Sequence, residues 1–163
     1  MARVVRRIVD ASPLILLGKI ARLDLLRVGG PEVVVPGAVL EEVGGHEPDD
    51  EAAQEIVLAS WIRIAPSAPI PSSIQAWDLG AGETAVLALA LDDRDCEVIL
   101  DDRDAKRCAQ TLGISARGTL GLVLLAKQLG EVPAARPLVD QLKHNGLYLT
   151  DQVINQALAL VGE

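Results

Sequence analysis

The sequence predicts an α/β fold in which a mostly parallel central sheet of about five strands is flanked by helices. Short β-branched runs alternate with longer helical patterns along the chain. Half of the 163 residues are hydrophobic. A chain of this length buries roughly 70% of its unfolded surface, so it can fold without disulfides or structural zinc. We therefore expect a single domain over residues 1–163.

The expected strands are short aliphatic runs, each followed by turn residues or by the start of a helix. They are Val4–Val9, Val33–Val35, Trp61–Ile64, Glu97–Leu100 and Ile114–Ala116. Because helical segments separate them, successive strands are expected to run parallel, with helices covering both faces of the sheet. The proline-rich segment 66–73 is expected to be a surface loop, since neither side of it holds enough strands for a separate sheet.

The expected helices begin at capping residues or prolines and end at glycines. Ser12 and Pro13 start the first helix, which runs through Ile20, and Gly44 and Gly45 end the second. The helices expected after the first are Ala38–Val43, Asp49–Ser60, Glu83–Asp92, Asp104–Leu112, Thr119–Leu129, Val139–Asn145 and a last amphipathic helix capped by Thr150.

Composition excludes several classes of protein. The net charge of −8 has the wrong sign for binding nucleic acid by diffuse attraction, so any such binding must rest on a local site. One Tyr, two Trp and no Phe argue against a base-stacking platform for single strands. The uncharged apolar stretches fall short of the roughly 20 residues of a membrane span. Asp10 and Pro13 interrupt what would otherwise resemble a signal peptide, and Cys96 and Cys108 lack a CxxC spacing, so we expect a cytoplasmic protein with two small buried thiols.

Acidic residues follow two of the predicted strands. Asp10 comes directly after the strand 7–9, and Asp101 and Asp102 come directly after the strand 98–100. In open parallel sheets the functional crevice lies outside the carboxyl ends of the strands, so these acids are expected to converge there. Three glutamates are within reach of the same edge: Glu41, Glu42 and Glu83. For Glu83 the alternative is a simple helix-start glutamate after a glycine-rich turn.

Such a cluster of carboxylates requires protons or divalent cations to offset the repulsion between its negative charges. Two charges about 5 Å apart at an effective dielectric near 20 repel by roughly 3 kcal/mol. The sequence has no HxH, HExxH or CxxC ligand set, so Mg²⁺ or Mn²⁺ on oxygen ligands is the expected guest. His46 has helical spacing to Glu42, but Gly44 and Gly45 argue against a helix between them, and His144 is expected on the surface.

Four segments resemble the PIN-domain superfamily, and within it the PIN-like group related to VapC toxins. They read IVDASPLI from Ile8, VPGAVLEEV from Val35, LGAGETAV from Leu79 and VILDDRDA from Val98. The resemblance continues to Glu163 and so covers essentially the whole chain. It implies a Rossmann-like sheet that carries an acidic quartet, binds Mg²⁺ or Mn²⁺ and hydrolyses RNA phosphodiesters.

The resemblance also implies roles for individual residues. The carboxylates that it implies for the metal are Asp10, Glu42 in preference to Glu41, Glu83, and Asp101 or Asp102, with Asp104 as a further candidate. Ser12 matches a small hydroxyl position near the metal and is a candidate phosphate contact. Independently of the resemblance, the cations nearest to these acids in the sequence are phosphate contacts or ordinary surface charges; they are Arg103, Lys106, Arg107 and Arg117. Thr119 is interpreted as a helix cap, with a hydroxyl beside the metal as the alternative.

The resemblance implies that the protein is a metal-dependent endoribonuclease. By resemblance it is the toxin of a toxin–antitoxin pair, bound by a small antitoxin protein and forming a homodimer. One alternative is a degenerate PIN-like module that binds a protein or RNA partner without cleaving it. Another is phosphoryl transfer, because Asp102-Arg103-Asp104 has the DxD pattern of haloacid-dehalogenase-type phosphatases. That fold normally carries the motif at its first strand, where this chain has Asp10-Ala11-Ser12.

Overall fold

The computed structural model of the chain describes residues 4–45 and 51–163. Its centre is a five-stranded, all-parallel sheet in the order β3-β2-β1-β4-β5. The strands are β1 (Arg6–Val9), β2 (Glu32–Pro36), β3 (Ile62–Ala65), β4 (Cys96–Ile99) and β5 (Ser115–Arg117). The α/β class and the parallel sheet predicted from the sequence are confirmed, with small shifts at the strand ends. Every residue of β4 is buried, as expected for a parallel strand covered on both faces.

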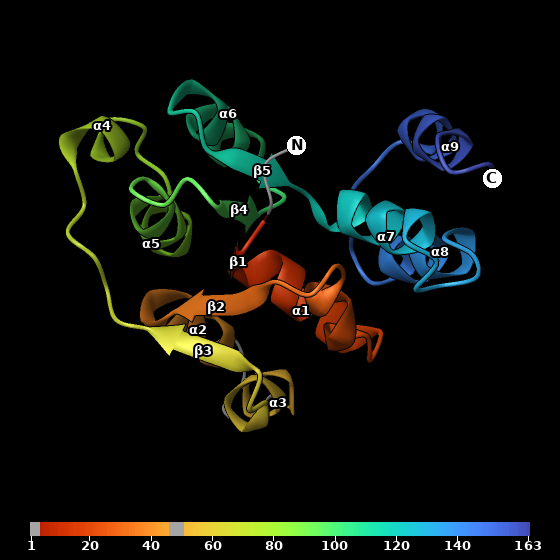
Figure 1. The fold of residues 1–163 in the computed structure, drawn as a ribbon, viewed down its shortest axis with the longest axis horizontal. Coiled ribbons are helices and arrows are strands. Elements are labelled where there is room, and N and C mark those ends of the chain that lie inside the picture. Colours follow the sequence, from red (N-terminus) through yellow and green to blue (C-terminus); the bar gives the residue numbers. More distant parts are fainter. Residues whose placement is uncertain (1–3, 46–50) are drawn as a thin grey trace.

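Helices connect the strands and cover the sheet (Figure 1). They are α1 (Ala11–Lys19), the 3₁₀ helix η1 (Leu23–Arg27), α2 (Gly37–Gly44), α3 (Glu51–Leu58), α4 (Ser72–Gln75), α5 (Ala81–Ala90), α6 (Arg103–Thr111), α7 (Thr119–Gln128), α8 (Arg136–His144) and α9 (Asp151–Ala159). In Figure 1, α1, α7 and α8 lie on the right of the sheet, and α5 lies on the left, where it contacts β1, β2 and β4.

The structure differs from the sequence prediction at several helix ends. Neither η1 nor α4 is predicted, because elements this short carry too little periodicity, and α4 begins inside the segment expected to be a loop. Helix α8 begins at Arg136, three residues before the predicted start. Pro137 belongs to its first turn, where the missing amide proton costs nothing. The predicted helix start at Asp49 and the predicted role of His46 lie outside the described residues.

An ion pair is buried in the centre of the sheet. Arg7 on β1 and Glu97 on β4 are direct neighbours in the strand register, and Arg7 Nε donates to Glu97 Oε1 at 2.7 Å. Arg7 Nη1 also donates to the carbonyl oxygens of Leu26 and Val28, each at 2.8 Å. These bonds satisfy most of the buried guanidinium and hold the end of η1 and the residue that follows it against the sheet.

Two further expectations can be compared with the structure. Cys96 and Cys108 are buried free thiols, as predicted, and burial raises the pKa of the Cys96 thiol to about 11. Across residues 4–45 and 51–163, none of the helices has the length and apolar character needed to cross a membrane.

Candidate functional site

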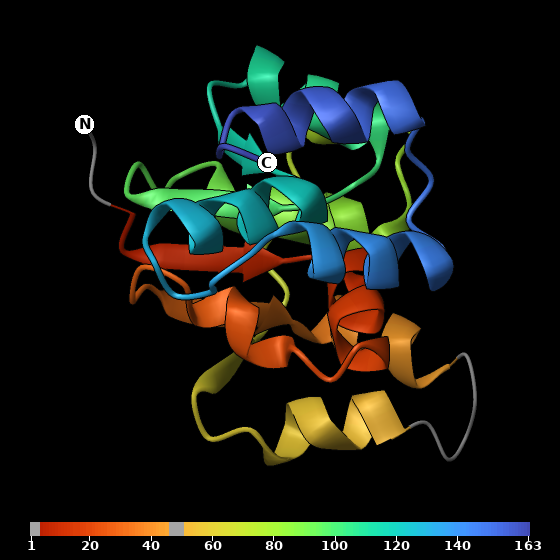
Figure 2. The same ribbon diagram turned by 90° about the vertical axis from the view of Figure 1, so that its right-hand side faces the viewer.

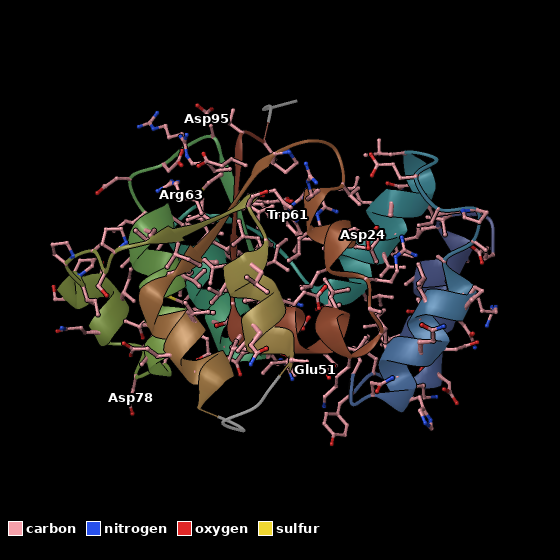
Figure 3. The ribbon with its side chains drawn as sticks, turned by 90° about the horizontal axis from the view of Figure 1, so that it is seen from below. Asp24, Glu51, Trp61, Arg63, Asp78 and Asp95 are labelled. Carbon is pink, nitrogen blue, oxygen red and sulfur yellow. The ribbon has the colours of Figure 1, made fainter. Side chains whose placement is uncertain are left out.

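The carboxyl ends of β1 and β4 meet where the strand order changes direction. From β1 the chain moves outward to β2 and β3, and then returns across the sheet to β4 and β5. Such a switch point leaves a crevice between the diverging connections, where α/β proteins bind ligands. Asp10 follows β1 here, and its backbone N–H donates to the Ile99 carbonyl at 2.9 Å. Figure 3 labels Asp95, which precedes the amino end of β4, and Asp78, which lies toward the opposite end of the molecule.

A cavity of about 690 Å³ opens at this switch point. Its lining includes four acidic side chains that come from the ends of β1 and β4 and from the first turn of α5. These are Asp10, Glu83, Asp101 and Asp102. Ser12 also lines this cavity, as do two of the predicted cations, Lys106 and Arg117, so seven of the predicted residues are brought together at one edge of the sheet. The convergence that strand order requires is therefore present.

Asp10 is the most buried of these acids. It is 4% exposed, and its Oδ1 has no hydrogen-bond partner in the described part of the chain. Burial raises the pKa of Asp10 to about 7; the Ala11 amide opposes this shift, and the negative charges of Glu83, Glu42 and Asp101 add to it. An orphaned, buried carboxylate oxygen among other acids is a position that a cation would satisfy.

Asp101 is held by the start of α7. The backbone N–H of Thr119 donates to its Oδ1 at 2.8 Å, and the Thr119 hydroxyl donates to its Oδ2 at 2.7 Å. Ser12 Oγ is 3.4 Å from the same Oδ2. The interpretation of Thr119 as a helix cap is wrong, because Gly118 occupies the cap position and the buried Thr119 hydroxyl instead orients Asp101.

Asp102 and Glu83 combine a local capping role with a place at the cavity. Asp102 is the N-cap of α6 and accepts a bond from the Ala105 N–H at 2.9 Å. Glu83 Oε2 accepts from the Gly80 N–H at 2.9 Å at the start of α5. Burial raises the pKa of Glu83, and the negative charges of Asp102 and Glu42 add to that shift, while the bond from Gly80 lowers it. Glu83 is thus a helix-start glutamate and also a wall of the cavity.

Gly82 allows Glu42 to approach Asp10. A β-carbon on Gly82 would lie 2.4 Å from Glu42 Oε2 and 3.1 Å from Asp10 Oδ1. Both oxygens therefore border the small space that the missing side chain leaves, and any larger residue would push Glu42 away. Of the two neighbouring glutamates, Glu42 is the one with a carboxylate placed beside Asp10.

The predicted cations fall into two groups. Arg117 lines the cavity, as does Lys106, whereas Arg103 and Arg107 are exposed on α6 away from its lining, together with Asp104. Arg117 Nε is 3.3 Å from Glu97 Oε2, so the buried ion pair extends to the cavity wall. A β-carbon on Gly118 would lie 2.7 Å from Lys106 Nζ and 3.1 Å from Asp101 Oδ1. The Lys106 amine therefore lies beside the acids.

The donor set fits a hard divalent cation. Carboxylate and hydroxyl oxygens suit Mg²⁺ or Mn²⁺, and the described lining contains no His or Cys for a softer metal. Among the described residues, no three acidic, His or Cys side chains are already gathered as a preformed metal site. Asp101, Asp102 and Glu83 are instead turned toward nearby N–H groups. Asp10 Oδ1 is the oxygen whose burial without a partner carries the fit.

The sequence prediction did not single out Tyr148, which also lines the cavity. This residue lies in the connection between α8 and α9 and is 96% exposed. Two features of the sequence could have drawn attention to this residue. Tyr148 is the chain's one tyrosine, and it comes shortly after Gly146, which ends a predicted helix.

Comparison with protein families matches residues 6–163 to the PIN domain. Proteins with this domain are generally nucleases that act on nucleic acids and typically use divalent metal ions. A search of curated proteins found no match. The match spans nearly the whole chain and agrees with the parallel sheet and the acidic edge, and the chain therefore belongs to the PIN-domain family.

Proposed function

We propose that this protein is a Mg²⁺- or Mn²⁺-dependent endoribonuclease that hydrolyses RNA phosphodiesters in the cavity at the carboxyl ends of β1 and β4. The observation that carries the proposal is Asp10, whose buried Oδ1 lacks a partner among the described residues and faces a set of carboxylates. Family membership supports nuclease chemistry in general, and the oxygen-rich lining supports a hard cation.

The side chains at the cavity have different proposed roles. The proposed metal ligands are Asp10, Glu42, Glu83, Asp101 and Asp102. A bound divalent cation supplies neutralisation of the phosphate charge and activation of the attacking water. Thr119 and Ser12 keep the Asp101 carboxylate in a fixed orientation. Lys106 and Arg117 place positive charge at the cavity wall, where they would contact the phosphates that flank the scissile bond.

We further propose that the protein is a cytoplasmic toxin whose partner is a small antitoxin. A chain with a net charge of −8 suits electrostatic capture by a basic partner segment. Exposed apolar side chains such as Leu58 and Leu160 provide surface that a homodimer or the antitoxin would cover. Size-exclusion chromatography with light scattering measures the proposed dimer directly.

A second candidate function is a non-cleaving PIN module that binds a protein or RNA partner. The observation that favours it is the absence, within the described residues, of a preformed group of metal ligands. The phosphatase alternative has less support, because Asp104 of the DxD pattern lies outside the cavity lining.

Calorimetric titration with Mn²⁺ distinguishes the two candidates without knowledge of the RNA. We expect wild type to bind Mn²⁺, Asp10→Asn to lose binding, and Asp140→Asn to bind as wild type does, because Asp140 is an exposed aspartate on α8 away from the cavity. Single-stranded RNA should then be cleaved by wild type in Mn²⁺ and left intact in EDTA. Equal Mn²⁺ binding by wild type and Asp10→Asn contradicts the proposed site, and a wild type that binds RNA without cleaving it supports the second candidate.

A further inference from the structure

The cavity has a second wall made by the connection between α8 and α9. This wall carries no charged side chain, whereas the other wall carries the carboxylates. It is formed by Gly146, Leu147, Tyr148 and Leu149. Figure 2 shows this connection at the edge of the molecule toward which the arrow of β1 points. The apolar wall and the acids thus share one cavity at the carboxyl end of the sheet, although they are far apart in sequence.

Tyr148 stands on a backbone that is fixed on both sides. Leu147 is buried, and its N–H donates to the Leu142 carbonyl at 3.0 Å. After the tyrosine, Thr150 Oγ1 accepts from the Val153 N–H at 3.2 Å and caps α9. The ring itself is 96% exposed, so it contributes little to the core. The backbone on either side therefore holds the position of Tyr148, while its exposed ring is available to contact a flat ligand.

We infer that Tyr148 stacks on a nucleobase of the RNA whose phosphate enters the acidic part of the same cavity. This inference rests on the proposed ribonuclease function. A phosphodiester bound between the carboxylates and Lys106 brings its neighbouring nucleosides against the cavity walls, and an aromatic face is the group that recognises a base without regard to its identity. One ring makes a single-base subsite, which is compatible with an aromatic content of only 2%.

The test compares Tyr148→Ser and Tyr148→Phe in binding a short fluorescein-labelled single-stranded RNA in Ca²⁺. The matched probe is a strand of the same length without bases. We expect Tyr148→Ser to weaken binding of the base-containing strand roughly 5- to 100-fold and Tyr148→Phe to bind nearly as wild type does, because a phenyl ring also stacks. Binding of the abasic strand should be unchanged in both variants. A fluorescent adenine analogue in the RNA should be quenched by wild type and not by Tyr148→Ser.

The outcomes separate this inference from the proposed function. If wild type binds RNA and Tyr148→Ser binds it equally well, the stacking subsite is wrong, the nuclease proposal stands, and the ring is left for a protein partner. If Tyr148→Ser weakens both strands equally, the ring acts without the base and the inference is again overturned. If wild type binds neither RNA nor Mn²⁺, both proposals fail. Because Tyr148 is exposed, both variants should retain the wild-type circular dichroism spectrum.

Discussion

The unpartnered Asp10 carboxylate predicts an unusual dependence of stability on pH in the absence of metal. Its pKa is raised from 3.8 in the unfolded chain to about 7 in the fold, so the folded state favours the protonated acid. The fold therefore loses stability as pH rises through this range, because the charged form is better solvated in the unfolded chain. The two pKa values differ by about 3, which corresponds to a loss of about 4 kcal/mol in the free energy of unfolding once Asp10 is ionised in both states. About 2.5 kcal/mol of this stability is lost between pH 5 and pH 8.

Replacing Asp10 with asparagine removes this titration. We expect the free energy of unfolding of wild type in EDTA, measured with urea, to be about 2.5 kcal/mol lower at pH 8 than at pH 5 from Asp10 alone. In Asp10→Asn most of that slope should disappear, and the part that remains comes from groups such as Glu83, whose pKa is also raised. Asp140→Asn is the matched control and should keep the wild-type slope.

The result that refutes this reasoning is a pH dependence in Asp10→Asn equal to that of wild type. Asp10 would then have the same pKa in the folded and unfolded chains, and the argument for a cation at its buried oxygen would lose its electrostatic basis. A second measurement follows from the same linkage. Mn²⁺ should raise the stability of wild type more at pH 8 than at pH 5, because the ligand must be deprotonated to bind metal.

Three other substitutions test the surroundings of the site. Gly82→Ala should keep the fold but weaken Mn²⁺ binding in calorimetry, because its methyl would sit 2.4 Å from Glu42 Oε2 and displace that carboxylate; unchanged affinity would remove Glu42 from the site. Thr119→Val should lower Mn²⁺ affinity roughly 10- to 100-fold by releasing Asp101, whereas Thr119→Ser, which keeps the hydroxyl, should retain most of it. Arg7→Met should cost about 3 to 5 kcal/mol in urea unfolding because it leaves Glu97 buried without its main partner. The double variant Arg7→Met/Glu97→Leu should recover most of that loss, and failure to recover would mean that Arg7 acts through its bonds to the carbonyls of Leu26 and Val28.

Much of the fold follows from local signals in the sequence. The β-branched runs, the spacing of apolar residues and the capping residues are properties of neighbouring positions, so they predict the strands and most helices. The capping role of Thr150 is confirmed by its bond to the Val153 N–H. Asp10, Asp101 and Asp102 could be predicted at one edge because each directly follows a buried strand, and parallel strands end on the same side.

Other features depend on which segments meet in space. The Arg7–Glu97 pair requires β1 and β4 to be neighbours, which strand order alone decides, and single arginines and glutamates in strands carry no local signal of a partner. The bond from Thr119 to Asp101 joins the start of α7 to the end of β4 in the same way. Tyr148 reaches the cavity only because the connection between α8 and α9 returns to the carboxyl edge of the sheet.

The sequence by itself determined the class of fold and the acids at its edge, because those depend on periodicity and strand direction. The tertiary structure decided which carboxylates are held by amides, which one is left buried without a partner among the described residues, and which aromatic residue lines the same cavity, because these depend on long-range packing.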